Sequence, residues 1–320
     1  MVWLKQFPDG YIPSRMAREF PVSNAARASL TEVSSRAVPW DSADAKPGVY
    51  EWESVEEYLL RLPNAKFKWW REIAAPWVFF VPSQGACPSC AGFGLDRARQ
   101  ATLANQIVNG FSEQKLERLN PLVTWSISKG GSVWGGATLQ QVLLAGNSHG
   151  VWTEEMAGEY DPRGRYSESW RKMDNDARLR QIGFSMIPGE GKLLAERILL
   201  CVKKGFGVIF GNNRAVDRFR KDKNGIYAAE TTYGGNHATA FGGWIEQNGE
   251  TYLLWMNSHG NIYEKDDDTP AFGGYMRWDT FVDFCSAGYV DAGVVLVAEA
   301  PYDPSVRVTL NIETGGGADV

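Results

Sequence analysis

The stretch VPSQGACPSCAGFG, which runs from Val81 to Gly94, carries Cys87 and Cys90 with only a proline and a serine between them. Three kinds of site contain such a pair: half of a zinc site, a redox-active dithiol, and a nucleophilic thiolate at the start of a helix. Each kind requires different partners elsewhere in the chain, so the remaining cysteines and histidines discriminate among the three.

Structural zinc sites need four ligands, usually including a second close pair of Cys or His residues. Cys201 and Cys285 stand far apart in separate apolar runs, and the three histidines lack the close spacing of zinc ligands. We therefore expect no metal and no cofactor. Because free cysteines are among the most buried residue types, Cys201 and Cys285 are predicted to be buried, inert thiols.

A redox dithiol is the second hypothesis. The apolar segment WVFFVP before the pair, with a helix expected after it, resembles a glutaredoxin-type CPxC site, in which the helix N-terminus lowers the pKa of the first thiol. A glutaredoxin fold is far shorter than these 320 residues, and it would leave the strand-rich last third without a role. Because a single CxxC is weak evidence, this stays the weaker alternative.

The third hypothesis makes Cys90 a nucleophile, which then needs a general base and a group that orients the base. The segment NHATAFGGW places His237 near the start of a predicted strand, and YLLWMNSHG places Asn257 at the end of the next. The QNGE at Gln247–Glu250 predicts a hairpin between them. Counted from that turn, the two residues are almost equally distant, so we predict that they face each other across the hairpin and that Asn257 fixes the imidazole tautomer.

Taken together, these segments resemble the papain-like cysteine peptidases. The stretch from Gln84 to Phe93 resembles their active-site segment, NHATAFGGW their His segment, and WMNSHG their Asn segment. The segment GGSVWGGATLQQVLLAGNSHGV is similar to their glycine-bearing loop and cleft helix. His237 lies within the roughly 130–150 residues downstream of the cysteine that the family shows, and Asn257 lies just beyond.

The resemblance implies a peptidase acting on a peptide or protein substrate, with the following roles. Cys90 attacks the carbonyl carbon as a thiolate, and His237 holds the partner proton and delivers it to the leaving amine. Asn257 orients His237. The Gln84 side chain donates to the oxyanion, with the Cys90 backbone N–H as second donor. The implied substrate-binding positions are the loop glycines, whose missing Cβ allows close approach of a substrate backbone: Gly135 and Gly136.

Three positions depart from the family pattern. Ala91 stands where the family usually has Trp after its cysteine, and His259 replaces the Trp that shields the His–Asn hydrogen bond. Cys87 matches a family half-cystine, but SKGGSVWGG, where its partner is expected, has no cysteine, so Cys87 is predicted to be a free buried thiol. The alternative function is therefore a catalytically weak or inactive papain-like module, acting as a structural or binding component of a large assembly such as a phage virion.

The predicted fold class is α+β, a two-lobed papain-like fold with a helical lobe and a β-barrel-like lobe. Helical periodicity dominates the middle of the chain, and β-branched and aromatic runs dominate the last third. We predict an extended N-terminal arm at 1–50 and a catalytic domain at 51–304. Within that domain we predict a helical lobe at about 75–190 and a β-rich lobe at about 191–304. A C-terminal tail is expected at 305–320.

Four helices are predicted from apolar periodicity and stop signals. They cover Val55–Pro63, the segment after Cys90, the segment ATLQQVLLAG with Gly146 as its end, and EGKLLAERILLCVKKG with Gly205 as its end.

Charge and hydropathy exclude some classes of function for this chain. The formal net charge is −5 and no dense Lys/Arg cluster occurs, so nucleic acid is not an expected partner. No uninterrupted apolar run is long enough for a membrane span, and MVWLKQFPDG lacks the apolar core of a signal peptide. We therefore expect a cytoplasmic or virion-associated protein. Because an irregular arm and a glycine-rich tail are usually ordered only when something holds them, we also expect partner subunits to bind both ends.

Overall fold

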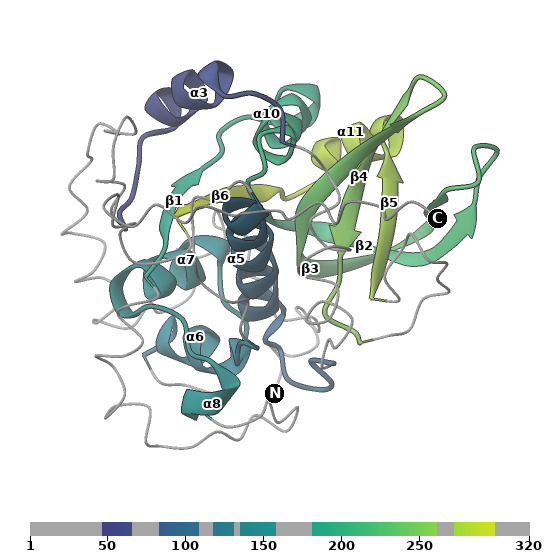
Figure 1. Ribbon diagram of the computed structural model, residues 1–320. Coiled ribbons are helices and arrows are strands. Elements are labelled where there is room, and N and C mark those ends of the chain that lie inside the picture. The colour runs from purple at the N-terminus through teal and green to yellow at the C-terminus, as the bar shows by residue number, and fades with distance from the viewer. Residues whose placement is uncertain are drawn as a thin grey trace, which may run out of the picture.

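The computed structural model describes residues 47–65, 83–108, 118–130, 135–157, 181–260 and 272–297, and Figure 1 shows their arrangement. The described helices are α3 (Trp52–Arg61), α5 (Cys90–Val108), α6 (Pro121–Ile127), α7 (Leu139–His149), α8 (Glu154–Ala157), α10 (Gly191–Lys203) and α11 (Trp278–Ser286). The described strands are β1 (Gly183–Met186), β2 (Val208–Lys221), β3 (Tyr227–Gln247), β4 (Glu250–Met256), β5 (Gly273–Arg277) and β6 (Asp291–Val297).

The described strands form one sheet in the order β1-β6-β2-β3-β4-β5, and each strand is antiparallel to its neighbour. The sheet also curls back on itself, because Ala228 near the start of β3 pairs with Tyr275 of β5 in parallel. The helices α5 to α8 gather on one side of the molecule and β2 to β5 on the other (Figure 1). The result is the predicted mixture of a helical region and a curled, barrel-like sheet.

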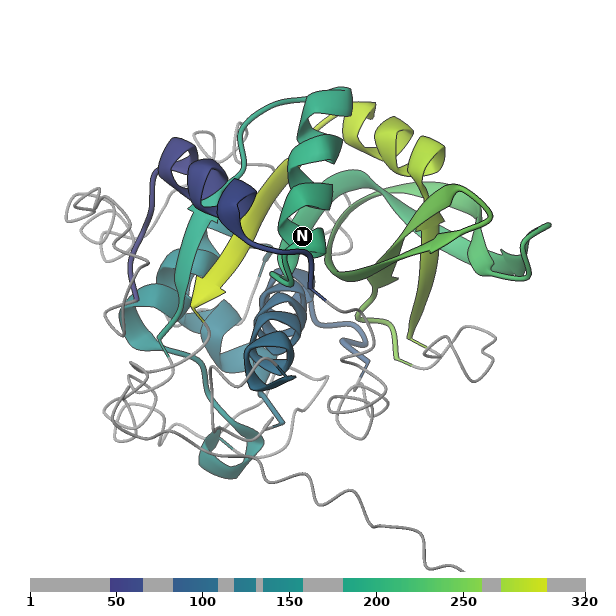
Figure 2. The ribbon, with the colours of Figure 1, turned by 45° about the horizontal axis from the view of Figure 1, so that its top comes forward.

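Two hydrophobic cores lie on the two faces of this sheet, because successive strand residues point to opposite sides. In β4, Tyr252, Leu254 and Met256 belong to the core that contains α5, α6 and α7. Leu253 and Trp255 belong to the core that contains α3, α10 and α11. Figure 2 shows α3 and α10 side by side on that second face, with α11 next to α10.

The long helix α5 is the central element of the first core. It is buried on every side from Cys90 to Asn105, which is why it lacks the polar face of a surface helix. Thr102 ties it to the sheet: its Oγ1 donates to the carbonyl of Val295 at 2.7 Å and accepts from the backbone N–H of Gly207 at 2.9 Å. The second half of α5 is therefore held against the sheet.

The helix predictions were confirmed in position, but the C-terminal end of one helix was predicted wrongly. The short helix expected at Val55–Pro63 is α3, and the helix expected in EGKLLAERILLCVKKG is α10, followed by Gly205 with φ +88°. Gly146 was predicted to end α7 and does not, since α7 continues to His149 and ends at Gly150 with φ 77°. Gly146 has a packing role instead.

A Cβ built on Gly146 would lie 3.1 Å from side-chain atoms of both Ile182 and Leu95. The missing side chain therefore lets α7 approach α5 closely. A glycine at such a contact is indistinguishable in sequence from a helix-terminating glycine, which explains the wrong end-point.

The QNGE hairpin between β3 and β4 forms as predicted. Asn248 and Gly249 occupy the two turn positions with φ of 52° and 78°, the left-handed conformations that a tight turn of this kind requires. Farther from the turn, the pairing shifts by one residue between Phe241 and Gly243, as at a β-bulge.

The observed register corrects one prediction. Ala240 pairs with Met256, so continuing this register brings His259, and not Asn257, directly opposite His237. The expected face-to-face pairing of His237 and Asn257 was wrong because the turn is centred on Asn248–Gly249, one residue later than we counted. Asn257 is instead a diagonal neighbour of His237, still within reach of its side chain.

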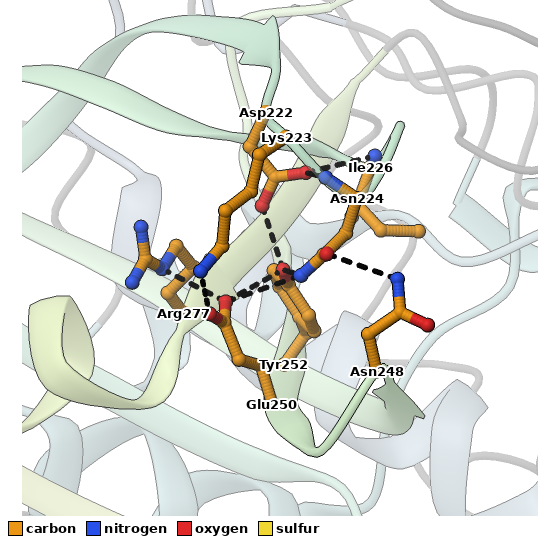
Figure 3. A network of polar contacts seen from close by, with 8 residues as sticks. All are labelled: Asp222, Lys223, Asn224, Ile226, Asn248, Glu250, Tyr252 and Arg277. Atoms are coloured by element: carbon orange, nitrogen blue, oxygen red, sulfur yellow. Dashed lines mark hydrogen bonds and ion pairs between the residues drawn. The ribbon is translucent and has the colours of Figure 1, made fainter.

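A polar network joins the turn between β2 and β3 to the strands β4 and β5 (Figure 3). Tyr252 Oη donates to Asp222 Oδ2 at 2.6 Å and accepts from Asn224 Nδ2 at 2.7 Å. Glu250 pairs with Lys223 at 2.6 Å and with Arg277 at 3.4 Å. Positive and negative groups are balanced in this network, which ties the turn after β2 to β4 and β5.

The domain division stays a prediction. The arm expected at 1–50 lies outside the described residues up to residue 46, and the tail expected at 305–320 lies wholly outside them. Within the described ranges, no helix combines the length and apolar character that crossing a membrane requires.

Candidate active site

Cys90 is the first residue of α5, so its side chain lies where the helix dipole is positive and first-turn N–H groups have no partner within the helix. Both effects favour a thiolate over a thiol. The side chain is fully buried and belongs to the same core as Ala238 and Ala240 of β3. The sulfur therefore lies at the junction of the central helix and the sheet.

The packing of α5 on β3 brings the first turns of α5 close to the strand that carries His237. Gly94, one turn after Cys90, lies against β3: a Cβ built on it would be 3.0 Å from the carbonyl oxygen of Thr239. Cys90 is about 6 Å back along the helix from Gly94, and His237 is about 7 Å back along the strand from Thr239.

His237 and Asn257 form a direct hydrogen bond. His237 Nε2 lies 2.6 Å from Asn257 Oδ1, and both side chains are 1% exposed. Because an amide oxygen only accepts, the imidazole carries its proton on Nε2. His237 Nδ1 is then an acceptor, and among the described residues no group forms a hydrogen bond with it. The ring thus has one nitrogen held by Asn257 and one available to a reacting proton.

Burial controls the charge of this imidazole. It lowers the pKa of His237 to about 4, because the cation loses its hydration, and the hydrogen bond to Asn257 offsets only part of that loss. At neutral pH the isolated ring is therefore neutral. An imidazolium requires a compensating negative charge close by, and a thiolate at Cys90 would provide one.

The segment before α5 is fastened to the segment that carries Asn257. The backbone N–H of Gln84 donates to the carbonyl of Ser258 at 2.8 Å, and Ser83 and His259 form an isolated antiparallel bridge. The Ser258 hydroxyl donates to Gln84 Oε1 at 2.5 Å. With its oxygen held by Ser258, the Gln84 amide presents Nε2 to the cysteine segment, where it lies 3.3 Å from the carbonyl of Cys87.

Solved structures of cysteine proteases share this architecture. Digestive procathepsin L 3 of Tenebrio molitor larval midgut matches over 83% of this chain and 88% of its own, with a TM-score of 0.50 and 17% identity. The proform of the Amb a 11 cysteine protease, a ragweed pollen allergen, matches over 99% of this chain and 74% of its own, with a TM-score of 0.51 and 15% identity. The chain has the papain-like cysteine peptidase fold.

The predicted fold class is thereby confirmed, as a papain-like arrangement of helices and one curled sheet. At these identities the similarity establishes the fold alone, and a fold does not establish chemistry. No protein-family model and no curated protein sequence matches the chain.

In this papain-like fold, the predicted cleft glycines precede α7. Gly135 has φ +79°, a conformation that favours glycine, and a Cβ built on it would have no atom within 4 Å. Gly135 and Gly136 are half-buried. The loop is anchored by Lys129, whose Nζ donates to the carbonyl of Gly135 at 2.8 Å and lies 3.4 Å from the ring centroid of Trp125.

Sequence reasoning missed Lys129 and Ser258. Burial lowers the pKa of Lys129 to about 7, while its interaction with Cys87 acts in the opposite direction. Lys129 thus lies beside the thiol that matches a family half-cystine, in the segment where the second half-cystine was expected. Ser258 follows Asn257 directly in the sequence. A hydroxyl side chain next to the predicted orienting amide could have indicated its role.

The remaining cysteines behave as predicted. Cys87, Cys201 and Cys285 are buried and free of disulfide bonds. Burial raises the pKa of the Cys201 and Cys285 thiols, which disfavours the reactive thiolate form. In the part of the chain that the structure describes, no three His, Cys, Asp or Glu side chains gather in a way that could hold a metal ion.

Proposed function

We propose that this chain is a cysteine peptidase that hydrolyses peptide bonds in a peptide or protein substrate, with Cys90 as nucleophile and His237 as its acid–base partner. One observation carries the proposal: His237 is held through Nε2 by Asn257 at 2.6 Å, while its buried Nδ1 makes no hydrogen bond with any described residue. A thiol nucleophile requires a base that one group orients, with its second nitrogen not engaged by another residue, and within the described part of the chain His237 meets both conditions.

The first half of the proposed reaction acylates the enzyme. The Cys90 proton passes to His237 Nδ1, and the thiolate attacks the substrate carbonyl carbon to form a C–S bond. The imidazolium then gives its proton to the leaving amine as the C–N bond breaks. Asn257 keeps the ring in one tautomer throughout. The product of this half is a thioester on Cys90.

Water completes the cycle in the second half. His237 Nδ1 accepts a proton from the attacking water, the C–S bond breaks, and a carboxylic acid product leaves. The sulfur and the imidazole return to their starting protonation states. In both halves, negative charge develops on the substrate oxygen, where Gln84 Nε2 and the Cys90 backbone N–H are the proposed donors.

The alternative, a catalytically weak or inactive papain-like module in a large assembly, is favoured by a different observation. Cys90 and His237 are 0% and 1% exposed, so a substrate carbonyl reaches the sulfur only after the covering groups move. If this alternative holds, the purified protein should associate with partner subunits and show no turnover. A monomer on size-exclusion chromatography that cleaves peptides would exclude it.

The direct test compares substitutions of two cysteines that lie only three residues apart in the sequence, Cys87 and Cys90. Wild type and Cys87→Ala should hydrolyse a mixed peptide library and react with a peptidyl electrophile directed at thiols. Cys90→Ala should do neither, while retaining the thermal unfolding midpoint of Cys87→Ala within a few degrees. Equal hydrolysis by wild type and Cys90→Ala would remove Cys90 from the mechanism.

A further inference from the structure

Asn257 contacts two imidazoles. Its Oδ1 lies 2.6 Å from His237 Nε2, and its Nδ2 lies 3.3 Å from Nδ1 of His259. The two rings themselves are stacked, with centroids 4.8 Å apart and planes inclined by 29°. His259 therefore touches both the proposed base and the residue that orients the base.

The chemistry of the Asn257 amide fixes the state of His259. An amide nitrogen only donates, so His259 Nδ1 must accept, and it can do so only as a neutral ring that carries its proton on Nε2. This bond also sets which way the amide faces. If the amide turned over, its NH₂ group would oppose the proton on His237 Nε2. The backbone N–H of Ser258, which donates to Asn257 Oδ1 at 2.8 Å, supports the same orientation.

Protonation of His259 would break its hydrogen bond with Asn257 and would place a positive charge next to His237. Its Nδ1 would then carry a hydrogen that opposes the Asn257 Nδ2 donor. The ring would also become a cation stacked on His237, which must itself become a cation during the reaction. A like charge at this separation disfavours the charged form of its neighbour.

Several described elements pack around His259 and bring titratable groups with them. Among the described residues, the group facing the His259 ring from β3 is His237, and the backbone of Ser83 pairs with His259 from the segment before α5. The ionisable groups of that segment and of α5 include the thiols of Cys87 and Cys90 and the buried pair Asp96 and Arg97 of α5. Arg97 lies 5.4 Å from the ring centroid of Phe272, whose carbonyl accepts from the Asn257 backbone N–H, and Lys129 after α6 interacts with Cys87. Cys90 is the group whose ionisation His259 would affect through His237.

We propose that His259 is a positioning residue that makes the site responsive to pH, an inference that rests on the proposed function. Neutral His259 holds Asn257 and permits the imidazolium of His237, whereas protonated His259 does neither. The site is then switched off in mild acid by a residue that makes no contact with substrate. A non-titrating aromatic residue at this position would lack the switch.

The test measures the rate at which iodoacetamide alkylates Cys90, followed by mass spectrometry from about pH 5 to pH 8, the range in which histidines titrate. His259→Asn keeps an acceptor near the position of Nδ1 without titrating, and His259→Phe keeps a stacked ring without an acceptor. Between pH 8 and pH 5 the wild-type rate should fall about tenfold more than the His259→Asn rate. At pH 8, His259→Phe should react more slowly than wild type, and His259→Asn should restore the rate.

Identical pH profiles for wild type and His259→Asn would overturn the inference. A second readout is the nitrogen-15 NMR spectrum of the imidazoles, in which His259 should be the Nε2–H tautomer at neutral pH. An Nδ1–H tautomer there would also overturn it, whatever the activity. Peptide hydrolysis at about pH 8, where His259 is neutral, tests the proposed function by itself, so the two failures are distinguishable.

Discussion

Gly94 of α5 lies against the backbone of β3 at Thr239, and this contact limits how closely α5 packs on the strand that carries His237. A Cβ on Gly94 would come within 3.0 Å of the Thr239 carbonyl oxygen and 3.1 Å of an Ile209 side-chain carbon. Backbone cannot rotate away as a side chain can. The helix would have to shift, and Cys90 would shift with it.

Gly94→Ala should therefore lower both stability and kcat. Overpacking of this kind costs about 1–3 kcal/mol in unfolding free energy, and a misplacement of about 1 Å at a reacting group can cost about 100-fold in rate. Gly146→Ala is the matched control, because the same added methyl on α7 would meet only side-chain atoms of Ile182 and Leu95 at 3.1 Å. Urea denaturation and peptide hydrolysis measure the two effects. Equal losses in both variants would contradict the rigid-contact argument.

Gln84→Ala should lower kcat by roughly 100- to 1000-fold with a smaller change in KM, because an oxyanion donor acts mainly in the transition state. Ser258→Ala should have a smaller effect, about tenfold, because it removes only the hydroxyl that holds Gln84 Oε1 at 2.5 Å. Steady-state kinetics on one peptide substrate separate the two. If Ser258→Ala is the more damaging variant, Gln84 is not the donor.

Much of this site could be predicted from sequence. The order of Cys90, His237 and Asn257, and a hairpin around the Asn-Gly turn, follow from local segments with strong turn and strand signals. The direct facing of His237 and Asn257 did not hold. Register depends on the centre of the turn and on the bulge near Phe241, and a bulge leaves no mark in the apolar pattern.

Some contacts of the folded chain were beyond sequence reasoning for a similar physical reason. Lys129 looked like an ordinary polar residue in a glycine-rich loop, and only the folded chain reveals its bond to the Gly135 carbonyl. Gly146 looked like a helix end, whereas its role is to let α7 approach α5. Both depend on packing between elements, which periodicity does not encode.

Lys129→Met should raise KM about tenfold while leaving kcat nearly unchanged, because it releases the cleft loop. The variant loses the 2.8 Å bond to the Gly135 carbonyl, and hydrogen bonds from charged groups contribute about 1.5–3 kcal/mol. Lys203→Met is the matched control, since Lys203 also lies over a Trp ring, 4.6 Å from the Trp244 centroid, but on α10. A KM change shared by both variants would argue against loop anchoring.

In the Cys90→Ala variant, where no thiolate can stabilise the imidazolium, His237 should make the protein less stable in mild acid. Burial lowers its pKa to about 4, against 6.5 for an ordinary histidine, so between these values the unfolded chain binds a proton that the folded chain does not. The free energy of unfolding therefore falls as pH drops from about 6.5 to 4, by about 3 kcal/mol in total. Denaturation of Cys90→Ala and of the Cys90→Ala/His237→Gln double variant across this range measures the difference.

Asp96 contributes the opposite slope, because burial raises its pKa to about 7 and stability falls as pH rises from 3.8 toward that value. The contribution is common to both proteins and cancels in their difference. The gap between Cys90→Ala and the Cys90→Ala/His237→Gln double variant should therefore change with pH in the direction stated. A gap that stays constant from pH 7 to pH 4 would mean that His237 is not buried as a neutral ring.

The most direct measurement of the central claim is the ultraviolet absorbance of the Cys90 thiolate, titrated against pH and corrected with Cys90→Ser. If Cys90 is ionised by the helix start and by His237, the thiolate should persist well below the ordinary thiol pKa of about 8.5, and His237→Ala should move its titration upward by more than about one pH unit. A Cys90 that ionises only in alkali, at the same pH in wild type and in His237→Ala, would contradict the account.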